Sequence, residues 1–354
     1  MIKIGIIGCG YIAGKHVATI SRIDRLQLAA VSDINQESMR KTITDYQSQV
    51  GKKSAVSCYE NYEKLIEDPT IDIVVIAVIS SLHATVAKQV MKQGKHVILE
   101  KPIALSLKEA DELITISQET NSKVLVCHQL RYRPLLKKLQ EMVENREFGE
   151  PYFAVSSLRL HRPVSYYNNS NWKGTWEKDG GMLVNQGIHM VDQLLWMMGQ
   201  ASTIYGELGK VVKTKETEDI ATGILQFKNG GKGLIEANTI TTPRNLGYEL
   251  TLFGEKGSFS IGGMQFNELT HCYVENKENT EELRALALDK DEQYYMYLDL
   301  LDAIIDDRQP QVSLLEGKQA LEAIFALYRA DRMKSLIHLP IEDFNTKEMG
   351  GKIG

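Results

Sequence analysis

The start of the chain constrains the fold more than any other feature. An apolar run, IKIGIIG, leads directly into a glycine-rich turn, GCGYIAG (residues 8–14), and from there into a helical pattern that begins at about Ala13. A strand that passes through such a turn into a helix is typical of the first unit of a parallel sheet with crossover helices. The motif therefore predicts an α/β domain at the N-terminus.

Four further apolar runs follow at the spacing that this architecture requires. LQLAAVSD, IDIVVIAV, HVILEKP and KVLVCHQ alternate with helical patterns. Strands that are apolar throughout are buried on both faces, so we predict a doubly wound parallel sheet, a Rossmann fold, with helices on both sides. We place this domain at residues 1–126.

After Gln129 the pattern changes. A helix predicted within residues 133–149 ends at a glycine suited to a C-cap, and seven strand patterns follow, with Asn229-Gly230 and Lys256-Gly257 where hairpin turns are needed. This order predicts an α+β domain with a mainly antiparallel sheet over residues 127–354. Two later helical patterns are expected to cover one face of either sheet, and the polar tail from Ile341 gives no basis for expecting order.

Composition excludes several classes of function. The net charge of −5 favours neither nucleic acid nor an anionic membrane as a partner. The four cysteines are scattered without a CxxC pair, which argues against a metal site and against disulfides, and favours a reducing cytoplasm. The N-terminus has no basic leader, and no apolar run is long enough to span a bilayer, so we expect a cytoplasmic protein.

The glycine-rich turn has the features of a dinucleotide site. The first glycine permits the tight turn, the second lets a pyrophosphate approach the backbone, and a small third residue, Ala13, lets the helix pack on the strand. The amides at the helix N-terminus favour phosphate. Asp33 ends the second strand and would bind ribose hydroxyls while repelling a ribose phosphate, so we predict NAD rather than NADP. The alternative, a structural turn with a capping aspartate, is less favoured.

Two further segments carry groups suited to alcohol oxidation. Glu100-Lys101-Pro102 follows the strand HVIL, at the edge of a parallel sheet where ligands bind; alone it would be read as a surface pair before a proline turn. Asn185 and His189 lie four positions apart near the glycine-rich start of a buried helix and therefore share a face. We predict His189 as the base, rather than a satisfied core histidine, with Lys101 holding the substrate oxygen. Their roles could be exchanged, because a lysine neutralised by burial is a base.

The segments GIIGCGYIAGKH, SSLHATVAKQVMKQGKHVILEKP and DGGMLVNQGIH together resemble the Gfo/Idh/MocA oxidoreductase family. The resemblance implies a second domain with a large open sheet often used for oligomer contacts, a substrate pocket between the domains, and hydride transfer between a sugar or cyclitol carbon and a nicotinamide. Lys101 and His189 correspond to the family lysine and histidine, and His83 to a position near the cofactor. The predicted cofactor-binding residues are Gly8, Gly10, Tyr11, Ile12, Asp33, Ser80, His83, Glu100, Lys101 and Gln129.

One position departs from the common family pattern. Asn185 stands where the family usually has an aspartate, and an amide cannot accept a proton. Asp192, three residues beyond His189, is an alternative orienter of the imidazole; a solvent or core-edge role for it is an equal alternative. The segments HRPVSYYNNSNWKGTWEKDGGMLVNQGIH and TPRNLGYELTLFGEKGSFSIGGMQFNE resemble a subgroup that carries this asparagine and oxidises the 3-hydroxyl of a UDP-linked sugar acid in bacterial surface-polysaccharide assembly.

The loop of residues 159–176 is rich in aromatic and basic side chains. Aromatic faces suit sugar C–H surfaces, and arginine recognises carboxylate or phosphate, although such a loop also suits an oligomer contact. The predicted substrate-binding residues are Lys101, Arg131, Arg159, Arg162, Tyr166, Trp172, Asn185 and His189. Three hypotheses follow: a nucleotide-sugar dehydrogenase, a dehydrogenase of free sugars or cyclitols, and a non-catalytic sugar sensor. A homo-oligomer, either a dimer or a tetramer, is expected.

Overall fold

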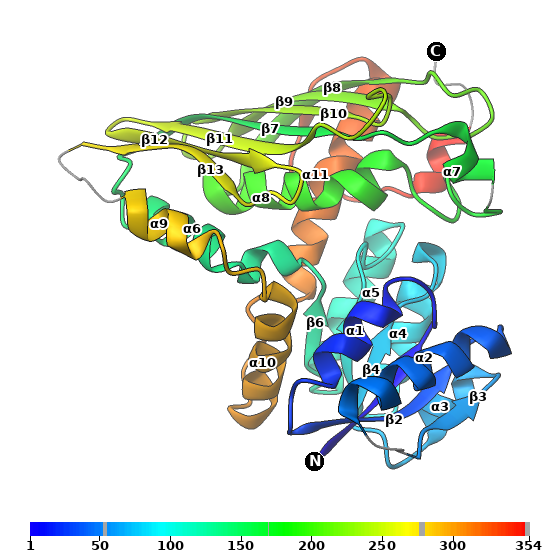
Figure 1. Cartoon of the computed structure of the whole chain (residues 1–354). Helices are drawn as coiled ribbons and strands as arrows, with labels where there is room; N and C mark the ends of the chain where they lie inside the picture. The colour runs from blue at the N-terminus through cyan, green and yellow to red at the C-terminus, as the bar shows by residue number, and fades with distance from the viewer. Residues whose placement is uncertain (52–54, 169, 276–279, 351–354) are drawn as a thin grey trace. The chain divides into compact units, whose positions relative to one another are not determined.

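The computed structural model describes residues 1–51, 55–168, 170–275 and 280–350, and the chain divides into two compact units (Figure 1). The first unit comprises residues 1–104, 108–129 and 293–317. The second comprises residues 105–107, 130–292 and the chain from Lys318 onward. Residues 293–317 therefore belong with the N-terminal unit, although they follow the whole second sheet in sequence.

The first unit is built on a six-stranded parallel sheet in the order β3-β2-β1-β4-β5-β6. Its strands are β1 (Ile2–Ile7), β2 (Leu26–Ser32), β3 (Ser57–Tyr59), β4 (Ile73–Ile76), β5 (His96–Leu99) and β6 (Val124–Val126). The chain order reverses between β1 and β4. In a doubly wound sheet this switch point, at the carboxyl ends of the strands, is where a dinucleotide binds.

Helices connect these strands and bury their apolar faces against the sheet. They are α1 (Ala13–Ile20), α2 (Gln36–Val50), α3 (Tyr62–Glu67), α4 (His83–Lys92) and α5 (Leu107–Glu119). Residues 293–305 of α10 (Glu292–Ile305) belong to this unit as well. Asn35 caps α2 by accepting hydrogen bonds from the amides of Glu37 and Ser38, which fixes where this helix begins.

The second unit contains an eight-stranded sheet in the order β13-β12-β11-β7-β10-β9-β8-β14. Only β7 and β10 pair in parallel; all other neighbours are antiparallel. The predicted hairpins at Asn229-Gly230 and Lys256-Gly257 are confirmed. The strands are β7 (Pro151–Arg159), β8 (Ala201–Gly209), β9 (Ile220–Phe227), β10 (Lys232–Asn238), β11 (Gly247–Gly254), β12 (Gly257–Gly263), β13 (Glu268–Val274) and β14 (Ile337–His338).

One face of this sheet is covered by α8 (Ile188–Met198), which packs on β7, β10 and β11. A π-helical turn, Leu183–Gly187, leads into α8. The opposite face carries half-buried and exposed side chains, among them Ile224. The remaining helices of this part of the chain are α6 (Pro134–Glu144), α7 (Val164–Asn168), α9 (Thr280–Leu286) and α11 (Leu314–Met333), whose first residues belong to the first unit.

The sequence-based description needs two additions. Strand β3 was not predicted, because its three residues, SCY, are exposed or half-buried and form no apolar run. The tail shows more order than its composition suggested: Phe344 is buried, and Asn345 caps the short helix Thr346–Met349 with a capping box.

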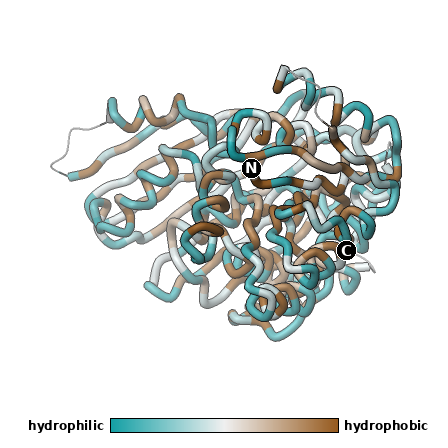
Figure 2. Tube along the Cα trace, turned by 90° about the horizontal axis from the view of Figure 1, so that it is seen from below, coloured by the Kyte–Doolittle hydropathy of each residue, from teal (hydrophilic) through white to brown (hydrophobic). Residues whose placement is uncertain are grey.

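Apolar segments are interrupted by polar ones along helices and strands alike (Figure 2). Among the residues that the structure describes, no helix is both long enough and apolar enough to cross a membrane.

Candidate active site

The glycine-rich turn after β1 leaves room for a phosphate group. Gly8 has φ +95°, and a Cβ there would collide with the backbone of Ala77 after β4, so only glycine fits. At Gly10, no heavy atom of the described residues beyond its chain neighbours lies within 4 Å of where a Cβ would stand. Tyr11 is 91% exposed. The N-cap of α1, Ile12, makes no side-chain capping bond and no acid occupies the first turn, which leaves the positive end of the helix dipole to an anion.

Asp33 lies against this turn. Its Oδ2 accepts a hydrogen bond from the Cys9 amide (2.7 Å), and its Oδ1 accepts one from the Asn35 amide (2.8 Å). The carboxylate at the end of β2 is therefore fixed beside the glycines, which is the placement that binding of an adenosine ribose requires.

We expect Asp33→Ala to lower kcat/KM for NAD by about 10- to 100-fold, since a hydrogen bond to a charged group contributes about 1.5–3 kcal/mol. The preference for NAD over NADP should fall at the same time, because the repulsion of a ribose phosphate is removed. Asp33→Asn is the matched control: it retains an oxygen for the Cys9 amide and lacks the charge. Unchanged cofactor preference in both variants would show that Asp33 only caps the turn.

The Glu100-Lys101 segment follows β5, and a buried histidine, His16, contacts the Glu100 carboxylate. His16 Nε2 lies 3.1 Å from Glu100 Oε1, and His16 Nδ1 lies 2.7 Å from the Tyr297 hydroxyl and 3.3 Å from Gln293 Nε2. Burial alone would raise the pKa of Glu100, but the hydrogen bond and charge of His16, with the charge of Lys101, lower it. Glu100 is thus held ionised, and its Oε2 accepts from the Lys101 amide (3.3 Å).

His16, Glu100 and Cys127 offer ligand atoms within 4.8 Å of one another, as in a metal site. Burial, followed by the charge of Glu100, raises the pKa of the Cys127 thiol well above its ordinary value. A metal requires the thiolate, and the histidine nitrogen is already engaged with Glu100. A hydrogen-bond network explains this group of residues better than a metal centre does.

His83, predicted to lie near the cofactor, is held by two backbone carbonyls. Its Nδ1 lies 2.6 Å from Pro102 O and its Nε2 lies 3.0 Å from Val78 O, and the ring is buried. With both nitrogens facing carbonyl oxygens, His83 ties the loop after β4 to the segment after Lys101. Ser80, at the start of the short helix after β4, and Gln129, directly after β6, stay as predicted cofactor residues.

In the second unit, Asn185 lies in the π-helical turn and His189 in the first turn of α8. π-Helical turns inside helices are frequent at functional sites. No side chain caps this helix start locally; instead the Leu183 amide donates to Glu218 Oε1 (2.9 Å), which also accepts from the Tyr328 hydroxyl (2.6 Å). A carboxylate from a distant loop therefore anchors the turn that carries both candidate residues.

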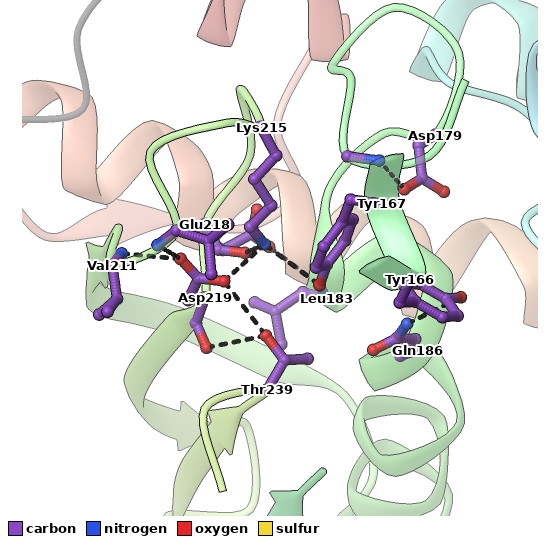
Figure 3. Close-up of polar contacts among 12 residues, drawn as sticks. Tyr166, Tyr167, Asp179, Leu183, Gln186, Val211, Lys215, Glu218, Asp219 and Thr239 are labelled. Atoms are coloured by element: carbon purple, nitrogen blue, oxygen red, sulfur yellow. Dashed lines mark hydrogen bonds and ion pairs between the residues drawn. The ribbon is translucent and has the colours of Figure 1, made fainter. Parts of the chain in front are cut away.

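Glu218 is fully buried, and no lysine or arginine among the described residues forms an ion pair with its carboxylate. The nearby ammonium of Lys215 pairs with Asp219 Oδ1 (2.8 Å) and donates to the Glu218 backbone carbonyl (2.6 Å) (Figure 3). Burial raises the pKa of Glu218 to about 7, although its hydrogen bonds oppose the shift. Gly181, with φ +107°, keeps this space open, because a Cβ there would collide with the Tyr328 hydroxyl.

This raised pKa predicts a pH-dependent stability. The folded chain holds the Glu218 proton up to about pH 7, whereas in the unfolded chain the carboxyl has its ordinary pKa of 4.5 and releases the proton there. Stability is therefore lost as pH rises between these values. The Glu218→Gln variant has no such proton to lose. Between pH 5 and pH 8 we therefore expect the natural chain to lose about 2–3 kcal/mol of unfolding free energy relative to this variant. Denaturant unfolding at both pH values measures it; parallel pH profiles would contradict it.

The amide of Asn185 is oriented by a residue that was not predicted. Its Nδ2 donates to Asp179 Oδ1, and Asp179 Oδ2 accepts from the Gly174 amide (2.7 Å). One of the two amide hydrogens is thus directed at a buried carboxylate. The sequence contained a signal for this residue, since Asp179 directly precedes the glycine pair at the helix start.

Asp192 binds an arginine. Arg131 donates to it from Nε (3.0 Å) and Nη2 (2.7 Å), and the guanidinium carbon lies 5.4 Å from the centroid of the Trp196 ring. This two-point contact gives Asp192 a defined role: it fixes the orientation of Arg131, which stays a proposed substrate residue.

The loop of residues 159–176 divides into two groups. Arg159, a predicted substrate residue, is paired within the sheet: its Nε donates to Glu236 (2.8 Å) and its Nη1 contacts Glu249 (3.5 Å). Arg162, Tyr166 and Trp172 do come together, with Lys173 beside both rings.

Comparison with known proteins agrees with this arrangement. Residues 2–128 match the GFO_IDH_MocA model, an oxidoreductase family with an NAD-binding Rossmann fold, and residues 136–260 match the C-terminal domain model of the same family. The WlbA dehydrogenase from Bordetella pertussis, crystallised with NADH and UDP-GlcNAcA, is 26% identical with a TM-score of 0.87, and the match covers 96% of this chain and 98% of that one. WlbA from Chromobacterium violaceum, with the same ligands, is 27% identical with a TM-score of 0.87, covering 96% of each chain. A myo-inositol 2-dehydrogenase from Thermotoga maritima is 26% identical over 96% of this chain and 98% of its own.

Proposed function

The chain belongs to the GFO/IDH/MocA family of oxidoreductases, and we propose that it oxidises the 3-hydroxyl of UDP-N-acetylglucosaminuronic acid in bacterial surface-polysaccharide biosynthesis. At the coarser level it is an NAD-dependent dehydrogenase of the sugar and polyol class. The observation that carries the finer proposal is the likeness, over nearly the whole chain, to two dehydrogenases whose crystals contain NADH and UDP-GlcNAcA.

The proposed roles follow from what alcohol oxidation needs. The hydroxyl proton must leave as the hydride departs, so the site needs a base and a group that stabilises the developing alkoxide. Bound NAD supplies the hydride acceptor. We assign His189 as the base and Lys101 as the cation that stabilises the oxygen. Asn185, held by Asp179, orients the substrate through its amide.

A panel of substrates tests the proposal. NADH formation is measured with UDP-GlcNAcA, UDP-GlcNAc, free hexoses and myo-inositol at equal concentrations. We expect the highest kcat/KM with UDP-GlcNAcA. A higher value with a free sugar or cyclitol would overturn the finer proposal and favour the second candidate, a polyol dehydrogenase, which the match to myo-inositol 2-dehydrogenase supports. No turnover with any of them would favour a sugar sensor.

We also propose that copies of the chain associate through the open face of the second sheet, as a dimer or tetramer, in a reducing cytoplasm. On this face Ile224 of β9 is 59% exposed, and Phe153 of β7 stacks on Phe253 of β11 with ring centroids 6.2 Å apart. Exposed apolar residues on a sheet face mark an interaction surface.

The association predicts the behaviour of a surface variant. Ile224→Lys with Phe253→Lys should lower the oligomeric state by placing like charges at every contact, with the fold of the single chain retained. Sedimentation velocity of the variant and the natural chain measures this. Lys92→Met, a change at an exposed position of the first unit, is the control; equal sedimentation of all three would exclude this face.

A further inference from the structure

Two cations gather around one aromatic ring in the loop before the candidate helix. The guanidinium carbon of Arg162 lies 5.2 Å from the centroid of the Tyr166 ring, and Lys173 Nζ lies 4.1 Å from the same centroid. Lys173 Nζ is also 5.8 Å from the centroid of the Trp172 ring. Because both charges lie close to the same ring centroid, the distance between them is shorter than the Debye length of ~10 Å in 0.1 M salt. The two charges therefore repel each other.

Neither cation forms an ion pair with a carboxylate among the residues that the structure describes. Arg162 Nη1 donates only to the carbonyl of His161 (2.9 Å) and to Asn245 Oδ1 (3.4 Å). Its Nε is buried and has no hydrogen-bond partner within the described part of the chain. Lys173 contacts the two rings through its ammonium group. Buried polar atoms normally have partners, so the buried Arg162 Nε needs an explanation.

A buried hydrogen-bond acceptor without a partner among the described residues lies beside these donors. Gln186, in the π-helical turn next to Asn185, donates from Nε2 to the Tyr166 hydroxyl (3.3 Å) (Figure 3). Its Oε1 is buried and, within the described ranges, has no partner. Tyr166 thus contacts the cations of Arg162 and Lys173 through its ring and the Gln186 amide through its hydroxyl. Gln186 lies in the turn that leads into the helix with His189.

We infer that Arg162, Lys173 and Gln186 form, around the Tyr166 ring, a subsite for an anionic group of the substrate, either a carboxylate or a phosphate. The anion would neutralise the two cations and accept from the unpaired Arg162 Nε, which matches the bidentate preference of guanidinium for such groups. Gln186 Oε1 would accept from a neighbouring hydroxyl or amide, while the ring packs against the sugar. The inference rests on the proposed function and deepens it, because it specifies an acidic sugar or a sugar nucleotide over a neutral polyol.

The test measures binding to the enzyme loaded with NADH, by calorimetry, without turnover. The variant is Arg162→Met with Lys173→Met. Matched probes differ by one anion: UDP-GlcNAcA against UDP-GlcNAc for the sugar carboxylate, and UDP against uridine for the phosphates. We expect the variant to bind the probe with the recognised anion at least about tenfold more weakly, and the matched probe that lacks this anion within about twofold of the natural chain. A loss confined to UDP-GlcNAcA identifies the carboxylate; equal losses for UDP, UDP-GlcNAc and UDP-GlcNAcA identify the phosphates.

Three controls keep the result specific. Arg162→Lys retains the charge and should recover part of the affinity. Lys228→Met removes a surface charge elsewhere in the second unit and should leave binding unchanged. Gln186→Leu should weaken binding of all sugar probes alike, because it removes an acceptor for a neutral group. Unchanged NADH affinity and thermal midpoint in the double variant exclude misfolding.

The inference is overturned if the double variant binds every anionic probe as tightly as the natural chain, if uridine and myo-inositol lose affinity equally, or if the natural chain binds none of the anionic probes. Its failure is separable from that of the proposed function. Turnover of UDP-GlcNAcA without anion-dependent losses contradicts only the subsite, whereas anion-dependent binding without turnover contradicts only the proposed reaction.

Discussion

Replacing Lys101 with methionine is expected to lower kcat by about 10²–10³-fold, the effect of removing one donor that stabilises a developing oxyanion. Methionine keeps most of the side-chain volume and removes the ammonium group. Stopped-flow measurement of NADH formation on the best substrate of the panel isolates the chemical step. NADH affinity of the variant is measured separately, because Lys101 is also a predicted cofactor-binding residue, whereas the glycine turn and Asp33 lie at other strand ends.

Two further variants interpret this result. Lys101→Arg keeps a positive charge beside Glu100, whose pKa the Lys101 charge helps to lower, and separates the loss of charge from the loss of shape. Lys92→Met removes an exposed lysine of the same unit and should retain full activity. A Lys101→Met enzyme with the natural kcat would remove Lys101 from the mechanism.

Replacing His189 with asparagine is expected to lower kcat/KM by about 10²–10⁴-fold, the range for losing a general base. Asparagine retains a hydrogen-bonding group of similar size, so the packing of α8 on the sheet should survive. His338→Asn, at an exposed strand position, is the matched control. If His189→Asn keeps the natural rate, the histidine is a core residue and the base must be sought elsewhere.

The pH profiles of the same two variants decide which residue is the base. An ordinary imidazole ionises near pH ~6.5, so a histidine base gives a kcat/KM that rises through this region. His189→Asn should abolish that rise, and Lys101→Met should preserve it at a lower level. The reverse pattern would assign the proton to a lysine neutralised by its surroundings.

Much of the fold was predictable because its signals are local. The apolar runs of β1, β2, β4, β5 and β6 are buried on both faces and therefore read as continuous hydrophobic stretches. Strand β3 has no such run, since it lies at the sheet edge with its residues exposed. The parallel pairing of β7 with β10 was equally inaccessible, because pairing partners are set by the path of the chain and not by residue periodicity.

The candidate site was predicted in part for a related reason. Some site residues lie near glycines or at predicted strand ends, and such positions can be recognised in the sequence. They are Asp33, Lys101, Asn185 and His189. Partners that arrive from elsewhere in the chain do not: Glu218 reaches Leu183 across 35 residues, and Tyr297 reaches His16 across 281. The pairing of Arg159 with Glu236 and Glu249 could not be predicted either, because these carboxylates lie on neighbouring strands.

The sequence by itself determined that an NAD-binding Rossmann unit precedes an α+β unit, and which side chains have the chemistry for alcohol oxidation, since residue type and local spacing fix these properties. Only the tertiary structure decided what each polar side chain touches. It assigned His83 to two carbonyls, Asp192 to Arg131 and Asn185 to Asp179, and it brought Arg162, Lys173 and Gln186 together around Tyr166. The physical reason is that the free energy of a buried charge or amide depends on the partner that meets it, and the fold chooses that partner from distant parts of the chain.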